Sequence, residues 1–156
     1  MKAKGAKPSD LEAPQLALAY LFQFMIGNTD FSFNGLHNTQ LVATPEGQIL
    51  PVAYDFDYAG AVNASYATPD PILRMRNVRQ RKFRGYCAIA DQYPRLLPLF
   101  REKKEAIYAL YHDEIGRLMD EKRVKETLSY FDEFYEMIAT PASAQRAFLF
   151  DCVGTR

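Results

Sequence analysis

The sequence has no tryptophan, only two cysteines among 156 residues and no long hydrophobic run. Its longest apolar stretch, from Leu16 to Ile26, is interrupted by Tyr20 and Gln23 and is shorter than the ~20 residues that a membrane-spanning helix needs. We therefore expect no transmembrane segment. The basic N-terminus is followed by acidic residues instead of a cleavage site, which predicts no signal peptide and, by default, a cytoplasmic protein.

The scarcity of cysteine excludes two classes of small domain. Cys87 and Cys152 are too few for a disulfide scaffold, and they are too far apart in sequence for the close-spaced pairs of a thiolate metal site. They can be two buried thiols or one bridge, and the sequence leaves both alternatives open.

Net charge is also absent, because 19 Lys and Arg residues balance 19 Asp and Glu residues. A pI near 6.7 argues against nucleic acid as a partner.

The balance of charges hides a segregation of acidic and basic residues along the chain. No Lys or Arg occurs between Lys7 and Arg74, a stretch with seven acidic residues, whereas residues 74–84 (RMRNVRQRKFR) carry six basic residues and no acid.

The residues that are present predict one folded domain. The composition is 48% hydrophobic and includes 11 Phe and 10 Tyr, which suffices for a core and excludes global disorder. We expect a flexible tail over residues 1–8 and a single domain over residues 9–156. Its expected parts are a motif-bearing helix and hairpin (9–62), an irregular basic segment (63–85) and a helical scaffold (86–156).

The first half of the domain predicts a helix and a β-hairpin. Helical spacing of apolar residues starts at Ser9 or Asp10 and stops at Gly27-Asn28, with Pro14 tolerated in the first turn. Two β-type runs follow, Thr39 to Ala43 and Gln48 to Tyr54, and a turn containing Pro and Gly joins them.

The second half predicts about three helices, from Leu96 to Ile115, from about Asp120 to Ala139 and from Pro141 to Cys152. The last of these is expected to dock through Phe148 and Leu149. The predicted fold class is therefore α+β and mostly helical.

Four polar residues in the first 60 positions indicate a candidate site. Asp30 follows the first helix, Asn38 opens the first strand and Asp55 ends the second strand. In a hairpin these strand ends are neighbours, so the three side chains should converge at its open end. Asp57 points to the same side as Asp55 in extended geometry. Carboxylate and amide oxygens suit Mg²⁺ or Mn²⁺, and one carboxylate could orient a nucleophile.

The segments GNTDFSFNGLHN and ILPVAYDFDYAG resemble the catalytic core of atypical kinases of the HipA and CotH type, and a group of uncharacterised bacterial proteins. The resemblance covers roughly Leu16 to Gly60. It implies a kinase C-terminal-lobe fold and Mg-dependent phosphoryl transfer from ATP to a hydroxyl-bearing substrate. By this resemblance Asp30 is the catalytic residue, Asn38 and Asp55 hold the metal, and Asp57 is either the partner of Asp55 or the true ligand.

The chain departs from protein kinases in two respects. The interval from Asp30 to Asn38 is wider than in the motif HRDLxxxN. Residues 1–14 leave no room for a phosphate-covering glycine-rich loop and a strand lysine. We therefore expect either a lower lobe that is inactive without an N-terminal lobe missing from this chain, or a site that works without nucleotide.

Other interpretations of these residues remain open at this point. Arg79, Arg81 and Arg84 could bind phosphate or an acidic partner, since guanidinium groups match both kinds of oxygen. The alternative function is then a non-catalytic, kinase-like interaction module that uses Arg74–Arg84. A hydrolase with Asp30 and Asp55 as its carboxylate pair is a third reading. His37 is expected to be a packed or exposed loop residue, because no second histidine lies at ligand spacing.

Overall fold

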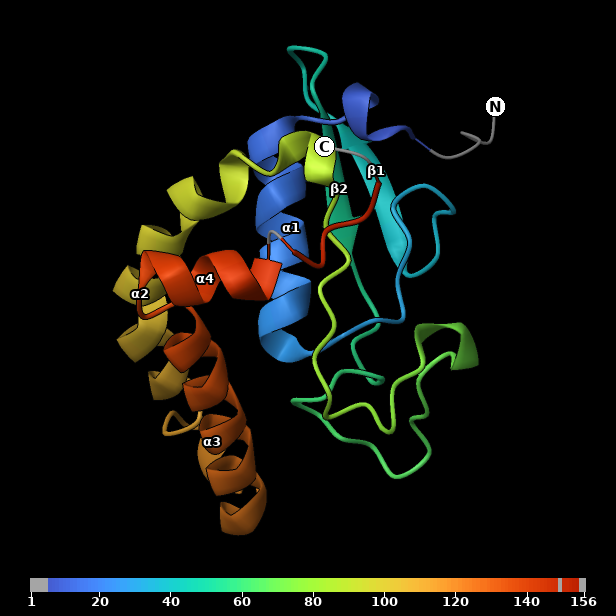
Figure 1. Ribbon diagram of the computed structural model, residues 1–156. Coiled ribbons are helices and arrows are strands. Elements are labelled where there is room, and N and C mark those ends of the chain that lie inside the picture. Colours follow the sequence, from blue (N-terminus) through green and yellow to red (C-terminus); the bar gives the residue numbers. More distant parts are fainter. Residues whose placement is uncertain (1–5, 149, 155–156) are drawn as a thin grey trace.

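A computed structural model describes residues 6–148 and 150–154 of the chain. It confirms the α+β, mostly helical class. One helix is followed by a two-stranded antiparallel hairpin and then by three helices (Figure 1). Across the described ranges, no helix is both long and apolar enough to span a membrane.

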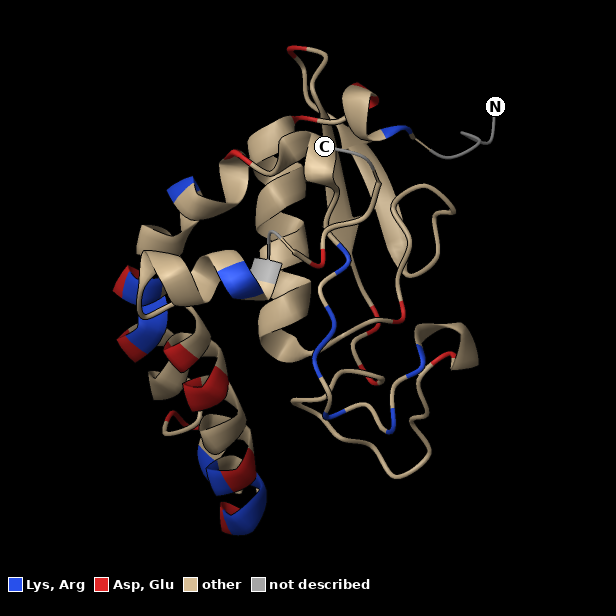
Figure 2. Cartoon of the chain, in the orientation of Figure 1, with Lys and Arg blue, Asp and Glu red and all other residues tan. Residues whose placement is uncertain are grey.

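Helix α1 spans Ala13–Ile26 and lies at the centre of the domain. It begins later than the predicted Ser9 or Asp10, because those two residues belong to a separate 3-10 turn, Pro8–Asp10, and Glu12 caps the helix by accepting a hydrogen bond from Gln15 N. The helix ends as predicted at Gly27, whose φ of 68° suits glycine. Its 14 residues carry no charge, as expected for a helix enclosed by its neighbours (Figure 2).

The hairpin forms where it was predicted, with the second strand one residue shorter at each end than expected. Strands β1 (Thr39–Ala43) and β2 (Ile49–Ala53) pair antiparallel, with Thr39 opposite Ala53 and Ala43 opposite Ile49. Tyr54 N continues the pairing by donating to Asn38 O at 3.0 Å. The start of β1 and the end of β2 are thus neighbours, and β2 packs against α1.

Helix α2 spans Gln92–Ala109, so the predicted bounds of Leu96 and Ile115 were wrong at both ends. Pro94 lies in the first turn, where a backbone N–H has no intrahelical acceptor, and Pro98 is accommodated inside the helix. After the helix the chain turns back, and Gly116 packs against the backbone of Leu110 and Tyr111, where a Cβ atom would not fit.

Helices α3 (Glu121–Met137) and α4 (Pro141–Phe148) complete the scaffold. Asp120 caps α3 by accepting from Arg123 N at 3.0 Å, in agreement with the predicted start. Helix α4 is shorter than predicted, and the expected docking through Phe148 and Leu149 lies outside the side chains that the structure describes.

The core is rich in aromatic side chains and collects around α1. Tyr20 and Phe24 of α1 contact rings from the loops and from α3, including Phe33, Phe83 and Phe134. Ala6 is also buried, and Pro8 begins the 3-10 turn, so the described part of the predicted tail belongs to the folded domain.

The two cysteines form a disulfide, which resolves the alternative that the sequence left open. Cys87 and Cys152 are 65 residues apart in sequence, and their Cα atoms are 5.1 Å apart. Val153 pairs beside this bridge with the chain at Tyr86, donating from its N to Gly85 O at 2.8 Å and accepting from Cys87 N at 3.0 Å. The C-terminal segment is therefore fastened to the start of the helical scaffold.

Candidate functional site

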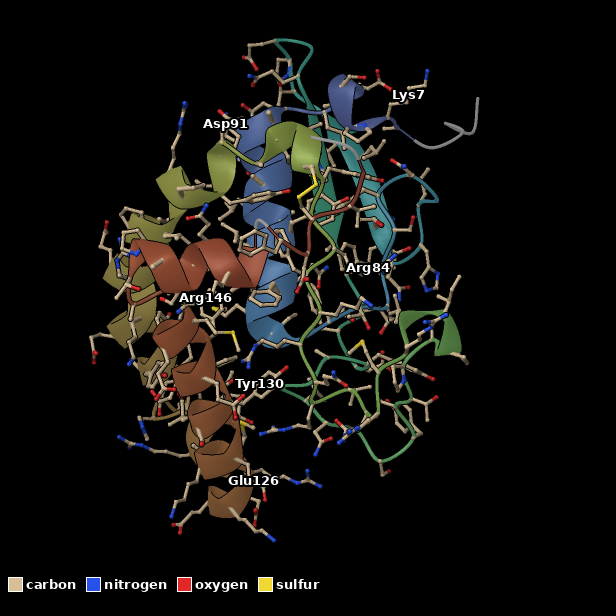
Figure 3. The ribbon with its side chains drawn as sticks, viewed as in Figure 1. Lys7, Arg84, Asp91, Glu126, Tyr130 and Arg146 are labelled. Atoms are coloured by element: carbon tan, nitrogen blue, oxygen red, sulfur yellow. A yellow bond between two sulfur atoms is a disulfide. The ribbon has the colours of Figure 1, made fainter. Side chains whose placement is uncertain are left out.

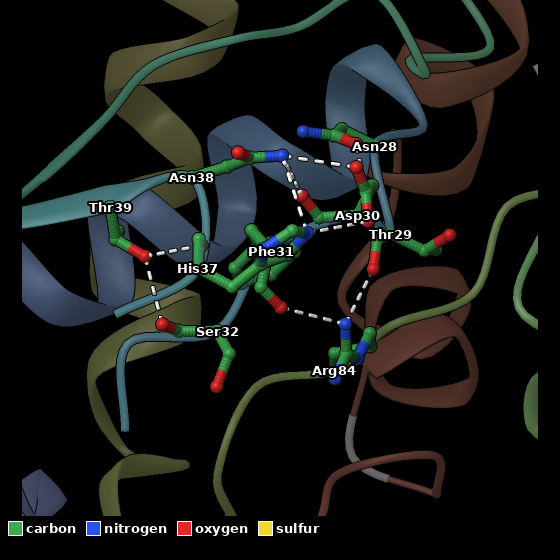
Figure 4. A network of polar contacts seen from close by, with 9 residues as sticks. All are labelled: Asn28, Thr29, Asp30, Phe31, Ser32, His37, Asn38, Thr39 and Arg84. Atoms are coloured by element: carbon green, nitrogen blue, oxygen red, sulfur yellow. Dashed lines mark hydrogen bonds and ion pairs between the residues drawn. The ribbon is translucent and has the colours of Figure 1, made fainter. Parts of the chain in front are cut away.

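Asp30 lies in the loop after α1 and is held by hydrogen bonds on several sides (Figure 4). Its backbone N donates to Asn28 Oδ1 at 3.0 Å. Asn38 Nδ2 donates to Asp30 O at 2.8 Å and to Asp30 Oδ2 at 3.0 Å, while His37 Nε2 lies 2.9 Å from Asp30 Oδ1. The predicted proximity of Asp30 and Asn38 is therefore observed as direct contact.

The loop from Asp30 to Asn38 closes on itself before the hairpin begins. Ser32 and His37 exchange two backbone hydrogen bonds, and Thr39 Oγ1 donates to the carbonyls of both. Asn38 adopts φ of 51°, a left-handed conformation that asparagine tolerates. This conformation turns the Asn38 side chain toward Asp30, which explains why an interval of eight residues still brings the two together.

Asp55 and Asp57 form the second half of the site, at the end of β2. Hydrogen bonding with Asp57, followed by repulsion from the Asp57 charge, raises the pKa of the Asp55 carboxyl above its ordinary value. The Asp30 charge raises the pKa of Asp55 further and His37 lowers it, so both halves of the site share one electrostatic environment. Tyr66 OH donates to Asp57 Oδ2 at 2.9 Å.

The donor set matches the chemistry of a hard divalent cation, because the four residues offer carboxylate and amide oxygens and an excess of negative charge. The negative charges of Asp57 and Asp30 raise the pKa of Asp55, and His37 opposes them only in part. Within residues 6–148 and 150–154, however, no three His, Cys, Asp or Glu side chains are grouped so that they could hold a metal ion. Metal binding at this site therefore stays a prediction. In that prediction, Asn38 supplies a ligand in addition to the carboxylates.

Two arginines of the basic segment pack against a buried tyrosine of α3. Arg79 and Arg81 lie over the ring of Tyr130, with the Cζ atoms 4.4 and 3.5 Å from the ring centroid. Arg81 donates to Phe24 O, Met25 O and Tyr130 O, and it pairs with Glu133.

Only 3% of the Arg81 side chain is exposed, and Arg79 donates to the carbonyls of Gly60 and Glu126. These guanidinium groups are engaged by the protein itself, an arrangement that does not favour the predicted binding of phosphate or an acidic partner. Such a partner would be left mainly with Arg74, Arg76 and Lys82, which lie at exposed positions.

Arg84, the third predicted ligand-binding arginine, lies beside the Asp30 loop (Figures 3 and 4). It donates to Thr29 O and to Phe31 O, the latter at 2.9 Å, and its Cζ lies 5.2 Å from the centroid of the Phe31 ring. Arg84 therefore contacts the loop that carries Asp30, whereas Arg79 and Arg81 support helices.

A small cleft of about 240 Å³ opens next to Asp30 and His37. One wall is the Asp30 loop, and the opposite wall comes from the turn at residues 68–73, with Tyr58 and Arg84 also lining the space. The cleft is large enough for a small polar group, such as a hydroxyl-bearing side chain, to approach Asp30.

Sequence reasoning missed several residues that build this site. His37 contacts Asp30 directly, although it was expected to be an ordinary loop residue. Asn28 and Tyr66 fix Asp30 and Asp57. The adjacency of Asn28 to Asp30 was a usable signal, since asparagine often accepts from the backbone N–H two residues later. The contact from Tyr66 depends on a loop path that no sequence pattern reports.

Comparison of this chain with protein-family models, with curated proteins and with solved structures gives no match.

Proposed function

We propose that this domain is the lower lobe of an atypical kinase of the HipA and CotH type, which transfers a phosphoryl group from Mg·ATP to a hydroxyl. The observation that supports the proposal most is the grouping at the hairpin mouth. Asp30 and Asn38 are in contact there, Asn38 O accepts from the N of Tyr54 directly before Asp55, and the Asp30 charge contributes to the raised pKa of Asp55.

The proposed chemistry divides the site into two functions. Asp30 would orient the acceptor hydroxyl in the adjacent cleft and accept its proton, since Asp30 is one of the residues that line that cleft. Asn38, Asp55 and Asp57 would hold Mg²⁺ or Mn²⁺, which would neutralise charge on the nucleotide phosphates. A kinase also needs a lobe that covers those phosphates, and the proposal assigns only the lower lobe to this chain.

The disulfide bears on where this function takes place. Structural disulfides are typical of oxidising compartments and are rare in the reducing cytoplasm. Because Cys87 and Cys152 are bridged, we propose an extracytoplasmic location in place of the cytoplasmic one expected by default.

Metal binding is the first test, because it can be measured on this chain alone. Binding of Mn²⁺ is followed by the loss of the free-ion electron paramagnetic resonance signal, in the absence and presence of ATP. We expect Asp55→Asn to weaken Mn²⁺ binding at least about tenfold, the scale of losing a charged ligand contact. Asp91→Asn is the matched control, because Asp91 is exposed before α2, away from the site. Equal affinity in all three proteins would exclude the metal role.

Phosphoryl transfer is the second test and uses labelled ATP with a version of the protein extended upstream to supply an N-terminal lobe. Asp30→Asn should abolish transfer while Mn²⁺ and ATP still bind, because the proposal places Asp30 at the acceptor hydroxyl. Transfer that persists at the wild-type rate in Asp30→Asn would contradict the catalytic role, and the absence of any transfer by the wild type would contradict the kinase proposal itself.

A further inference from the structure

Arg84 holds the two carbonyl groups that flank Asp30. Its Nη1 donates to Thr29 O on one side and to Phe31 O on the other, and its guanidinium group lies over the Phe31 ring (Figure 4). A single side chain therefore fixes the peptide unit before the candidate catalytic residue and the peptide unit after Phe31.

The carbonyl of Asp30 itself accepts from Asn38 Nδ2. Three successive carbonyl groups, from Thr29 to Phe31, thus accept hydrogen bonds from side chains, and two of these bonds come from Arg84. Hydrogen bonds from a charged donor are stronger than those between neutral groups. Among the side chains that donate to these three carbonyl groups, Arg84 therefore contributes most to the backbone conformation around Asp30.

Arg84 can serve this purpose because its own segment is fixed on both sides. Phe83 is 1% exposed and packs edge-on against Phe24 and Tyr93. Gly85 accepts from Val153 N, and the Cys87–Cys152 disulfide follows two residues later. The guanidinium group is therefore presented to the Asp30 loop from a rigid support.

We propose that Arg84 is a positioning residue for Asp30 and that the Cys87–Cys152 bridge supports it in this role. The functional consequence rests on the proposed role of Asp30 at an acceptor hydroxyl, but the positioning itself does not. The proposal replaces the earlier expectation that Arg84 binds an external phosphate or acidic partner.

The test measures hydrogen exchange of the Asp30 backbone amide and the side-chain amide resonance of Asn38 by ¹⁵N nuclear magnetic resonance, without metal or nucleotide. In Arg84→Gln we expect exchange at Asp30 to accelerate at least about tenfold, because two hydrogen bonds from a charged donor are lost. Amides in the middle of α3 should keep their wild-type rates. Arg76→Gln is the matched control, since Arg76 is an exposed arginine of the same basic segment.

Two further variants keep the proposal testable if Arg84→Gln does not fold. Arg84→Lys retains one charged donor but not the guanidinium fork, so exchange at Asp30 should fall between the wild-type and the expected Gln rates. The double variant Cys87→Ser, Cys152→Ser should accelerate exchange at Asp30 in the same direction by loosening the support.

Unchanged exchange at Asp30 in Arg84→Gln, or in Arg84→Lys if the Gln variant is not folded, would overturn the proposal. An acceleration equal to that in α3 would also overturn it, because it would report global unfolding only. If exchange changes as expected but the version extended by an N-terminal lobe transfers no phosphoryl group, the positioning role stands and the kinase proposal fails.

Discussion

The Nδ2 group of Asn38 donates to two oxygens of Asp30, the backbone carbonyl at 2.8 Å and carboxylate Oδ2 at 3.0 Å. The pair connects the loop after α1 to the first residue before β1. The site is therefore assembled by a contact between the helix and the hairpin, which ties its geometry to the packing of these two elements.

Replacing the amide of Asn38 by a carboxylate should separate this pair. Asn38→Asp removes the donor and places a second negative charge against Asp30, so we expect the free energy of unfolding to fall by about 1–3 kcal/mol. Urea unfolding at neutral pH measures the change. Asn63→Asp is the control, because Asn63 shares the φ of 51° but lies outside the pair. If both variants lose the same free energy of unfolding, the loss comes from the left-handed backbone conformation and not from the contact with Asp30.

The raised pKa of Asp55 predicts a pH dependence of stability. In the unfolded chain this carboxyl has a pKa of about 3.9. Between that value and its raised folded pKa, the folded state binds more protons than the unfolded state. The contribution of Asp55 to the free energy of unfolding therefore falls as the pH rises through this window.

Asp57→Asn should weaken this dependence, because it removes the repulsion yet leaves an acceptor for Tyr66 OH. Urea unfolding between about pH 4 and pH 7 compares the wild type, Asp57→Asn and the exposed control Asp91→Asn. We expect the free energy of unfolding to decline less steeply with pH in Asp57→Asn than in the other two proteins. Parallel curves for all three proteins would contradict the assignment.

Arg81 should be a strong determinant of stability. Arg81→Met keeps much of the apolar length but leaves the carbonyls of Phe24, Met25 and Tyr130 without this donor, so we expect a loss of more than about 2 kcal/mol. Arg76→Met, at an exposed position, should change stability by less than about 0.5 kcal/mol. The two variants are compared by chemical denaturation, and similar values for both would refute the buried role of Arg81.

The disulfide should contribute roughly 4 kcal/mol to stability, since it closes a loop of 65 residues in the unfolded chain. Unfolding is measured for the oxidised wild type, for the wild type under reducing conditions and for the Cys87→Ser, Cys152→Ser variant. Reduction should not alter the double variant. Reduced and oxidised wild type of equal stability would show that the bridge has no stabilising role.

The hairpin and its residues were predictable because their signals are local. The turn from Thr44 to Gly47 and the alternation around it specify the strands, and antiparallel pairing then places Asn38 and Asp55 at the same end. The bounds of α2 were less predictable. Whether Pro98 ends a helix or is enclosed by it depends on the burial of Leu97 and Phe100 on either side, a property of the packed core.

The basic segment shows the limit of sequence reasoning most directly. The sequence shows six basic residues in 11 positions, and the fit of guanidinium groups to phosphate and carboxylate oxygens predicted Arg79, Arg81 and Arg84 as ligand-binding residues. In the fold, Tyr130 receives two of these three guanidinium groups over its ring, and Arg84 reaches carbonyl groups more than 50 residues away in sequence.

The sequence by itself determined the α+β class, the hairpin and the order in which Asp30, Asn38 and Asp55 follow one another, because helix caps, turns and alternation act over a few residues. Only the tertiary structure decided that Cys87 and Cys152 are bridged, that His37 contacts Asp30 and that Arg84 supports the Asp30 loop. These contacts join distant segments, and their geometry depends on how α1 packs against the rest of the chain.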